Sequence, residues 1–311
     1  GILGTGDIND RFLPGARLTD AVEVVAVGSR TAARAAAFAE RHDIPRAHGT
    51  YEELLADPGV EAIYNALPNS LHHEWTLRSL AAGKHVLCEK PYTRHPAEVD
   101  EAFDAAERAG LVLSEAFMWR HHPQARRLVE GLPGIGPLQA IRATFGYVQE
   151  GAADVRLRPD LDGGSLMDVG CYCVSGSRLI AGEEPDVVYG VAQPGPTGVD
   201  IRFSGMLHFP SGVVAEFTSG FTSTHHTLEA MGSGGSLMLT NPWQGQPVSI
   251  VRDGVETKLD GDNAYRLELE DVGRAIRGEG PPLLGREDAM GQARTLDGLL
   301  RSAETGQPVR L

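Results

Sequence analysis

Three side chains of the kinds that move protons stand out in the sequence: Lys90, Asp168 and Tyr172. Lys90 follows residues 85–89, an apolar run that predicts a strand, and it precedes Pro91. In open α/β sheets ligands bind beyond the carboxyl ends of the strands. An ammonium group at such a place can donate a hydrogen bond to a substrate hydroxyl and lower the pKa of that hydroxyl. The alternative is a surface lysine that simply ends a strand.

Asp168 and Tyr172 belong to a segment, residues 163–172, that starts with two glycines and leads into a predicted helix. Residues four apart on a helix share one face. A phenol has a pKa near 10, and a positive charge close to it favours the phenolate, so Tyr172 is a candidate general base. The alternative is that Tyr172 packs in the core while Asp168 is a first-turn carboxylate stabilised by the helix dipole.

The segment Gly4-Thr5-Gly6 follows a short apolar run and precedes a helical pattern. In dinucleotide-binding βα turns the first glycine allows the bend, and the second lets the backbone approach the pyrophosphate at the helix N-terminus. Asn9 occupies the third glycine position. The fingerprint is therefore incomplete, and an ordinary βα turn is the alternative.

The next predicted strand, residues 22–27, is followed by Gly28-Ser29-Arg30. NAD-preferring sites carry an Asp or Glu at this place for the ribose hydroxyls, and this sequence has neither. A serine hydroxyl and an arginine guanidinium suit a 2′-phosphate instead. We therefore expect NADP rather than NAD, and the alternative for Arg30 is a solvated arginine at the start of a helix.

The elements that must position these residues follow two patterns. Up to about residue 119, strands predicted at 22–27, 62–67, 85–89 and 111–113 alternate with helices predicted at 31–43, 51–56, 71–82 and 96–109. This alternation indicates βαβ units and a parallel sheet. Beyond it, strands are predicted at 138–148, 187–191, 201–209, 213–218, 236–239 and 248–251, with helices at 166–181, 265–277 and 286–304. Turn residues between these strands predict a mostly antiparallel sheet.

Three blocks carry a resemblance to a known family: Gly4-Thr5-Gly6-Asp7-Ile8, then Leu67-Pro68-Asn69-Ser70-Leu71-His72, and then Gly83-Lys84-His85-Val86 with Glu89-Lys90-Pro91. They resemble the glucose–fructose oxidoreductase, inositol dehydrogenase and rhizopine-catabolism (Gfo/Idh/MocA) family, and the resemblance covers essentially the whole chain. Within it, the chain is similar to the branch of dimeric dihydrodiol dehydrogenases and NADP-dependent D-xylose dehydrogenases.

The resemblance implies an α/β fold with an N-terminal Rossmann domain and a C-terminal α+β domain that has a large, mostly antiparallel open sheet. We place these domains at residues 1–119 and 120–311. It also implies hydride transfer between NADP, with NAD as the lesser alternative, and a hydroxyl or carbonyl carbon of a sugar or cyclic polyol. Oligomers form through the open sheet in this family, so a homodimer or homotetramer is expected.

The resemblance also assigns residues. Lys90 and Tyr172 match catalytic positions, Tyr172 where many members have histidine. Asp168 matches a position that contacts a substrate hydroxyl or supports the residues that do, and it is also a catalytic candidate. Arg156 matches a frequent arginine of the active-site loop and is a candidate for substrate binding. The cofactor residues that it implies are Gly4, Thr5, Gly6, Asp7, Ile8, Ser29, Arg30, Leu67, Pro68, Asn69, His72, Glu89, Lys90, Trp119 and Arg120. For His72 a packing role is an equal alternative.

Composition excludes several other classes of protein. The chain has 311 residues and a formal net charge of −14, which disfavours nucleic acid and anionic lipid surfaces as partners. No apolar run approaches the roughly 20 residues of a membrane helix, and no Cys/His set has the spacing of a structural zinc site, so neither membrane nor metal is expected. Three cysteines form no even framework, which suits a reducing, cytoplasmic location.

Three alternatives to a sugar or dihydrodiol dehydrogenase differ in what they would do with the cofactor. A ketosugar reductase would run the same chemistry in reverse, and an NAD-dependent glycosidase-type enzyme would oxidise its sugar only transiently. A non-catalytic dinucleotide-binding sensor needs neither Lys90 nor Tyr172, so the presence of both disfavours it.

Overall fold

A computed structural model describes residues 1–151, 154–243 and 248–311. The chain forms two compact units. Unit 1 comprises Gly1–Met118 and Asn263–Met290, and unit 2 comprises Trp119–Asp262 and Gly291–Leu311. The chain therefore passes from unit 1 to unit 2 next to residue 119, and it returns to unit 1 for residues 263–290. The domain limits 1–119 and 120–311 stay a prediction about functional domains.

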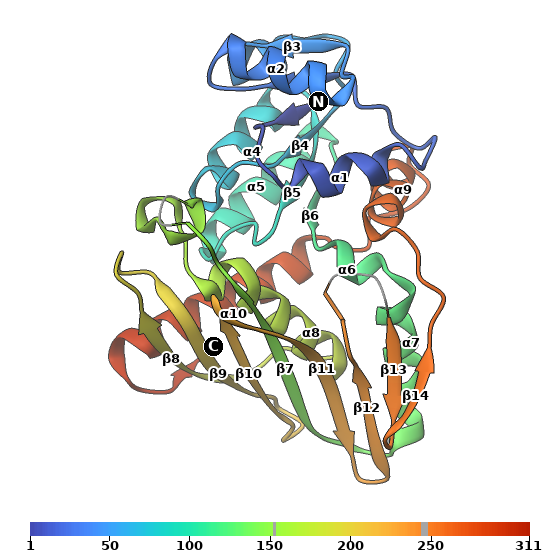
Figure 1. Cartoon of the computed structure of the whole chain (residues 1–311), viewed down its shortest axis with the longest axis vertical. Helices are drawn as coiled ribbons and strands as arrows, with labels where there is room; N and C mark the ends of the chain where they lie inside the picture. The colour runs from blue at the N-terminus through green and yellow to red at the C-terminus, as the bar shows by residue number, and fades with distance from the viewer. Residues whose placement is uncertain (152–153, 244–247) are drawn as a thin grey trace. The chain divides into compact units, whose positions relative to one another are not determined.

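Unit 1 is built on a six-stranded parallel sheet in the order β3-β2-β1-β4-β5-β6 (Figure 1). Its strands are β1 (Ile2–Leu3), β2 (Ala26–Gly28), β3 (Arg46–His48), β4 (Ala62–Asn65), β5 (His85–Glu89) and β6 (Leu113–Ala116). This is the strand order of the Rossmann fold, in which the order reverses between β1 and β4. The predicted Rossmann domain is confirmed.

Alternating side chains along these short strands fill two cores, one on each face of the sheet. Ile2 and Tyr64 belong to a cluster with Phe12 of the first helix, whereas Leu3 and Ile63 belong to a second cluster. Successive residues of a strand point to opposite faces, which explains why sequence neighbours separate in this way. Both faces are apolar, as expected for a parallel sheet covered by helices.

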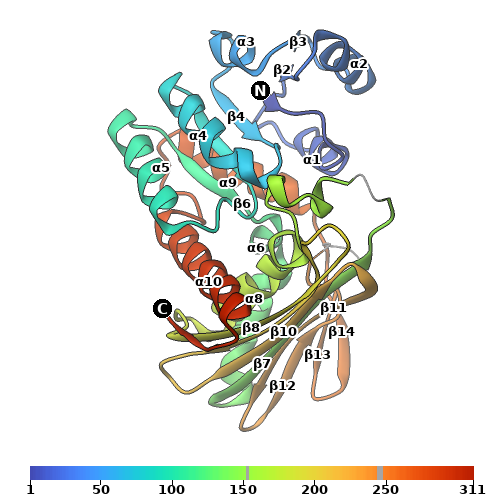
Figure 2. The ribbon, with the colours of Figure 1, turned by 90° about the vertical axis from the view of Figure 1, so that its left-hand side faces the viewer.

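The helices of unit 1 are α1 (Asn9–Ala16), α2 (Ala32–His42), α3 (Tyr51–Ala56), α4 (His72–Ala81), α5 (Pro96–Ala109) and α9 (Ala264–Ile276), with a 3₁₀ turn η1 (Asn69–Leu71). Figure 2 shows α4 and α5 on one side of the sheet and α1 on the other. α9 packs on α1 so closely that a Cβ on Gly15 would lie 2.6 Å from the Cβ of Tyr265. Segment 263–290 is therefore part of unit 1.

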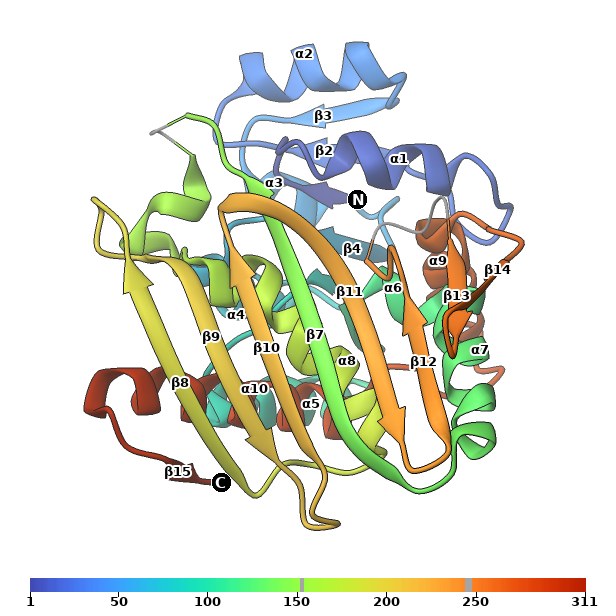
Figure 3. The same ribbon diagram turned by 60° about the horizontal axis from the view of Figure 1, so that its bottom comes forward.

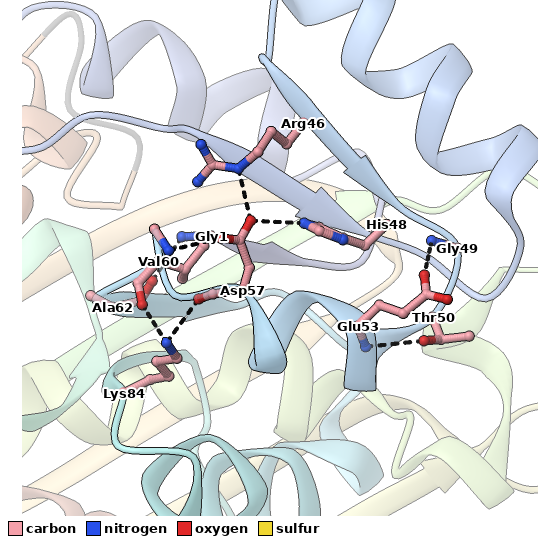
Figure 4. A network of polar contacts seen from close by, with 11 residues as sticks. Gly1, Arg46, His48, Gly49, Thr50, Glu53, Asp57, Val60, Ala62 and Lys84 are labelled. Atoms are coloured by element: carbon pink, nitrogen blue, oxygen red, sulfur yellow. Dashed lines mark hydrogen bonds and ion pairs between the residues drawn. The ribbon is translucent and has the colours of Figure 1, made fainter.

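The family-specific block Gly83-Lys84-His85 has a structural role in unit 1 (Figure 4). The Lys84 ammonium is buried and donates to the carbonyl oxygens of Asp57 and Val60 at 3.0 and 2.6 Å. The carboxylate of Asp57 in turn accepts from Arg46 at 2.7 Å, and the hydrogen bond from the Gly59 amide is the main reason that its pKa falls to about 2. This network links β3, the turn after α3 and the start of β5.

We expect Lys84→Met to destabilise the protein without altering its chemistry. Methionine keeps the unbranched stem of lysine, but the two buried carbonyl oxygens lose their donor, at a cost of about 1–3 kcal/mol. Urea titration measures the loss, with Lys258→Met as the control because Lys258 is exposed on a strand edge. Equal stability of the two variants would show that the buried ammonium contributes nothing.

Unit 2 contains a nine-stranded sheet in the order β14-β13-β12-β11-β7-β10-β9-β8-β15 (Figure 3). Its strands are β7 (Leu138–Val148), β8 (Val187–Pro194), β9 (Asp200–His208), β10 (Val214–Gly220), β11 (Thr222–Gly232), β12 (Gly235–Leu239), β13 (Ser249–Arg252), β14 (Val255–Lys258) and β15 (Val309–Arg310). β7 pairs with β10 in parallel, and the other described strand pairs of this sheet are antiparallel. The predicted mostly antiparallel sheet is confirmed.

Helices of unit 2 cover one face of this sheet. They are α7 (Pro123–Gly131) and α8 (Cys171–Ala181), with the 3₁₀ turns η2 (Leu132–Ile135), η3 (Val155–Leu157) and η4 (Pro159–Leu161) and a π-helical turn η5 (Leu166–Gly170); α6 (Met118–His121) and α10 (Arg286–Thr305) span the points where the chain changes unit. In Figure 3, α8 and α10 lie behind the sheet. Ala143 and Phe145 of β7 are buried, whereas Arg142 is exposed, so the strand alternates between a covered and an open face.

Several elements differ from the sequence-based predictions; the short strands β3, β14 and β15, for example, were not predicted. Strand pairing in β2 begins only at Ala26, because its neighbour β1 has two residues, and the predicted strand residues Val22 and Val24 instead pack on the core from irregular backbone. β11 was not predicted, since its first half is polar. The single helix predicted at 166–181 begins as the π-helical turn η5. In the part of the chain that the structure describes, no helix is long and apolar enough to cross a membrane.

Candidate active site

The turn between β1 and α1 is shaped to admit a phosphate group. Gly4 has a φ of +94°, which favours glycine. A Cβ on Gly6 would meet no atom within 4 Å, so the space beside this backbone is open. Asn9, which stands in the third glycine position, is fully buried and donates from Nδ2 to the carbonyl oxygens of Gly4 at 3.3 Å and Gly6 at 2.9 Å. Asn9 therefore braces the turn, and the residues present fit a dinucleotide pyrophosphate.

A cationic cluster follows β2, where the sequence predicted a 2′-phosphate site. Ser29 is buried and its amide donates to the carbonyl of His48 at 3.1 Å, while Arg30 is exposed. Burial raises the pKa of the Tyr51 phenol, and the charges of Arg30 and Arg34 oppose that rise. The positive charges of both guanidinium groups therefore lower the pKa of the same phenol, that of Tyr51 at the start of α3.

Sequence reasoning missed Arg34 and Tyr51. Arg34 stands four residues after Arg30, and its amide donates to the Thr31 hydroxyl that caps α2. Arg30 precedes the extended N-cap Thr31 and so lies outside α2, which means that the only signal for Arg34 was its closeness to Arg30 in the sequence. Tyr51 had no such signal, since it reaches the cluster only through the fold.

His72 connects two of the family motifs. Its Nε2 lies 2.8 Å from the carbonyl oxygen of Leu67 and its Nδ1 lies 2.9 Å from that of Pro91, which follows a cis peptide bond. The side chain is 1% exposed, and burial lowers the pKa of the imidazole. Both neighbours are carbonyl oxygens, and a neutral imidazole donates only one hydrogen bond, so the ring can donate to only one of them. Through these two contacts His72 links the loops after β4 and β5. Its contact with the cofactor stays a prediction.

Glu89, at the end of β5, is held by two partners. Its Oε1 accepts from the hydroxyl of Tyr64 at 2.5 Å and its Oε2 accepts from the amide of Lys90 at 3.2 Å. Burial raises the pKa of Tyr64 well above its ordinary value, so this phenol is a donor. The ring of Tyr64 stacks on Phe12 of α1, with centroids 3.7 Å apart. Lys90, half-buried, thus follows a rigid strand end in unit 1.

Unit 2 carries the other predicted catalytic residues. Tyr172 is the second residue of α8 and is 8% exposed. Its ring packs edge-on against Phe145 and Trp243, with centroids 5.2 and 5.9 Å away. These contacts fix the plane of the phenol. The packing role considered from the sequence and a chemical role of the hydroxyl are compatible, because the aromatic contacts engage the ring.

Asp168 lies in η5 between two partners. Tyr147 donates from its hydroxyl to Oδ2 of Asp168 at 2.7 Å, and Nε of Arg156 lies 3.3 Å from Oδ1. Arg156 also contacts the carboxylate of Asp154 at 3.2 Å. Burial works against the charge on Arg156, but Asp168, Tyr147 and Asp154 together raise the pKa of the guanidinium. The structure therefore joins the predicted pair Arg156 and Asp168 and adds Tyr147, which sequence reasoning missed.

Trp119 lies in the core of unit 2, and the neighbouring Arg120 is half-buried. Trp119 is fully buried, with its ring edge-on to Trp243 at 5.2 Å. Arg120 reaches the Ser175 hydroxyl at 3.5 Å. Their contact with the nicotinamide stays a prediction. In the described ranges no group of three His, Cys, Asp or Glu side chains could hold a metal ion.

Asp200, at the start of β9, accepts at Oδ2 from the Ser165 hydroxyl at 2.7 Å and from the Leu166 amide at 2.8 Å. Burial raises its pKa from 3.8 to about 6, against the effect of these bonds. A carboxyl whose pKa is higher in the folded than in the unfolded chain adds stability below pH 3.8, and that contribution is lost as the pH rises through about 6.

We therefore expect Asp200→Asn to remove part of the pH dependence of stability. The shift corresponds to about 3 kcal/mol. Between about pH 4 and about pH 7, the free energy of unfolding of the parent protein is expected to fall relative to that of the variant by up to this amount. Urea titrations at both pH values measure the difference, and a difference independent of pH would contradict the raised pKa.

These features define a class of protein, the Rossmann-fold oxidoreductases with a separate substrate unit. A turn that fits a dinucleotide pyrophosphate and a cationic cluster belong to unit 1, and a candidate acid–base residue with a polar network belongs to unit 2. Comparisons with known proteins agree. Residues 1–117 match the model of the oxidoreductase family with NAD-binding Rossmann fold, and residues 123–238 match the GFO/IDH/MocA C-terminal domain.

Several relatives match along most of their length. D-xylose 1-dehydrogenase (NADP(+)) 2 of Haloferax volcanii is 38% identical over 100% of this chain and 99% of its own. Trans-1,2-dihydrobenzene-1,2-diol dehydrogenase of Sus scrofa is 39% identical over 78% of this chain and 74% of its own. Among solved structures, KijD10, a 3-ketoreductase of Actinomadura kijaniata in complex with NADP and TDP-benzene, has a TM-score of 0.92 and 29% identity, covering 97% of this chain and 96% of its own. The chain belongs to the Gfo/Idh/MocA oxidoreductase family.

Proposed function

We propose that this chain is an NADP-dependent oxidoreductase that transfers hydride between the nicotinamide and a hydroxyl or carbonyl carbon of a sugar or cyclic polyol. The observation that carries this proposal is the network of Tyr147, Asp168 and Arg156, because it offers an acceptor and a cation next to the segment of Tyr172. Such groups suit a substrate with several neighbouring hydroxyls. The 38% identity with an NADP-dependent D-xylose dehydrogenase supports the same substrate class.

In this proposal the bound nicotinamide supplies the acceptor or donor of the hydride. Tyr172, as phenolate, takes the proton from the reacting hydroxyl, and in the reverse direction it returns that proton to the forming alkoxide. The ammonium of Lys90 lowers the pKa of the phenol and of the substrate hydroxyl. Asp168 and Arg156 bind the neighbouring hydroxyls and orient the reacting carbon.

The first test follows reduced-nicotinamide absorbance when NADP⁺ is mixed with a panel of aldoses and cyclic diols, including D-xylose, D-glucose and a trans-dihydrodiol. NAD⁺ runs in parallel. Reduction of NADP⁺ by one class of these alcohols supports the proposal and identifies the substrate class. Absence of turnover in both directions, in a protein that binds NADP, would contradict it and favour a sensor.

The likeness to a 3-ketoreductase supports a second candidate, a ketosugar reductase. The same residues would serve, with Tyr172 donating the proton to the carbonyl oxygen. Oxidation of NADPH by ketosugars, without reduction of NADP⁺ by aldoses or diols, would favour this candidate.

The cationic cluster after β2 leads to a prediction about the cofactor. A double variant, Arg30→Ala with Arg34→Ala, is expected to raise the KM for NADP by about tenfold or more and to leave that for NAD almost unchanged. Each charged hydrogen bond to a phosphate contributes about 1.5–3 kcal/mol. Arg41→Ala is the control, because Arg41 is on the same helix but contacts Asp10 at 3.5 Å. An equal effect on both cofactors would contradict a 2′-phosphate site.

We also propose that the chain forms a homodimer or homotetramer through the open face of the sheet in unit 2. Tyr189, Val191 and Met206 are 37%, 52% and 49% exposed on neighbouring strands β8 and β9. An apolar patch of this kind marks an interaction surface. Sedimentation of the pure protein tests the proposal, with Val191→Glu and Met206→Glu expected to give monomers, and a parent protein that sediments as a monomer would contradict it.

For the location of the enzyme we propose the cytoplasm. Cys88, Cys171 and Cys173 are all buried, and no disulfide joins them in the described part of the chain. Cysteines that form no disulfide are typical of a reducing compartment.

A further inference from the structure

The helix that carries Tyr172 begins without a cap of its own. Ser165 occupies the N-cap of η5, and its side chain makes no cap hydrogen bond to the turn. The first amide groups of a helix lack partners within the helix. Here Asp200 supplies an acceptor from another element, since its Oδ2 binds both the Leu166 amide and the Ser165 hydroxyl. The contact joins residues more than thirty positions apart in the sequence.

Close packing shows that this contact is built into the fold. Gly164 has a φ of +115°, and a Cβ there would lie 2.2 Å from Oδ1 of Asp200. At the other end of η5, a Cβ on Gly170 would lie 2.9 Å from Oγ of Ser219 on β10. The hydroxyls of Ser165 and Ser219 are 3.2 Å apart. Strands β9 and β10 thus hold both ends of the π-helical turn.

We propose that Asp200 is a positioning residue that sets the orientation of η5 and, through it, of Asp168 and Tyr172; this inference rests on the proposed function. Asp168 lies two residues beyond the anchored Leu166, and Tyr172 follows within the next turn. Turns of π-helix often occur at functional sites, and this one places Asp168 against Tyr147 and Arg156. A shift at the anchored end changes the 2.7 Å hydrogen bond between Tyr147 and Asp168 directly.

The carboxylate suits this role because it accepts two hydrogen bonds at one oxygen. A charged acceptor forms hydrogen bonds roughly twice as strong as a neutral one. Burial raises the pKa of Asp200 to about 6, so the group is ionised at neutral pH and available as an acceptor. The side chain reaches Ser165 and Leu166 rather than the groups that contact substrate, so its effect on the reaction is indirect.

The experiment compares Asp200→Ala with Asp200→Asn. Alanine removes both hydrogen bonds, and we expect kcat to fall by about tenfold to a hundredfold, as misplacement by about an ångström does. The KM for NADP is expected to stay unchanged, because the turn at Gly4 and Gly6 and the cationic cluster after β2 belong to unit 1. Asparagine keeps an oxygen acceptor, so we expect kcat to recover to within a few-fold of the parent protein. Asp186→Ala is the matched control, since Asp186 binds the exposed His208 at the end of β9.

A second measurement separates this proposal from the proposed function. Hydrogen exchange of the amides of residues 164–172 is expected to accelerate in Asp200→Ala and to return toward the parent rate in Asp200→Asn. This readout needs no turnover, so an inactive parent protein would overturn the proposed function while exchange still tests the anchor. If Asp200→Ala does not fold, Ser165→Ala replaces it, with a smaller loss of kcat expected. Unchanged exchange and unchanged kcat in the folded variant would overturn the positioning role, as would equal kcat losses in the alanine and asparagine variants.

Discussion

Tyr172→Phe is expected to lower kcat by about 10²- to 10⁴-fold, the range that a general acid–base group contributes. The variant lacks only the hydroxyl, which the proposal makes the proton acceptor. The contacts of the ring with Phe145 and Trp243 are retained, so the fold and the affinity for NADP are expected to persist. Steady-state kinetics with the substrate found in the first assay, together with NADP binding by fluorescence, measure both effects.

Tyr189→Phe is the matched control for this prediction. Tyr189 lies on β8 with its ring 37% exposed on the open face of the sheet, and its hydroxyl has no part in the proposed chemistry. If the Tyr172→Phe variant keeps the kcat of the parent protein, Tyr172 serves packing alone. Packing in the core is the alternative that the sequence left open for this residue.

Lys90→Met is expected to produce the second large effect. Methionine preserves the length of the side chain but removes the positive charge that stabilises a phenolate and a developing alkoxide, so kcat falls by about a hundredfold. The phenol then ionises only at a higher pH, and the rising limb of the kcat profile moves upward in pH. Both are measured by initial rates across the pH range with NADP⁺ saturating.

Two comparisons make the Lys90 result specific. Lys258→Met removes an exposed ammonium on β14 and is expected to leave the rate unchanged, whereas Lys84→Met, from the same family block as Lys90, is expected to reduce stability. A Lys90→Met variant that loses stability but not kcat would reverse the assignments of the two lysines.

The double variant Tyr172→Phe with Lys90→Met tests whether residues of the two units act on one reaction. Groups that work as a unit have strongly non-additive effects, because losing either disables the same step. We expect the double variant to be about as slow as the slower single variant. Fully multiplicative losses would mean that the two residues contribute independently, and the proposed joint mechanism would be wrong.

Much of the fold and half of the candidate site could be predicted from the sequence, because the signals are local. The turn at Gly4 and Gly6 needs only the conformational freedom of glycine and the strand before it. The apolar run before Lys90 predicts that this lysine lies at a strand end. The place of Ser29 and Arg30 after the second strand predicts that they contact the cofactor. The family block at residues 83–91 identified the fold family for the same reason, since its residues are consecutive.

Because the sequence signals are local, some predictions needed the structure to refine them. The block Gly83-Lys84-His85 is as recognisable as Glu89-Lys90-Pro91, yet Lys84 holds backbone carbonyls while Lys90 is the candidate for chemistry. Both are lysines, and the sequence shows only that Lys84 precedes the strand at residues 85–89 and that Lys90 follows it. The structural role of Lys84 appears only in its contacts with the carbonyl oxygens of Asp57 and Val60.

What the tertiary structure alone decided depends on contacts between residues far apart in the sequence. Tyr147 meets Asp168 across 21 positions and Asp200 meets Ser165 across 35. Helix α9 returns to pack on α1, which no pattern near residue 263 indicates. A sequence pattern reports the conformation of its own segment, whereas the partners of a side chain are set when strands pair and helices pack. The sequence therefore determined the family, the parallel sheet and the candidates for the reactive residues, and the tertiary structure decided which neighbours hold those residues in place.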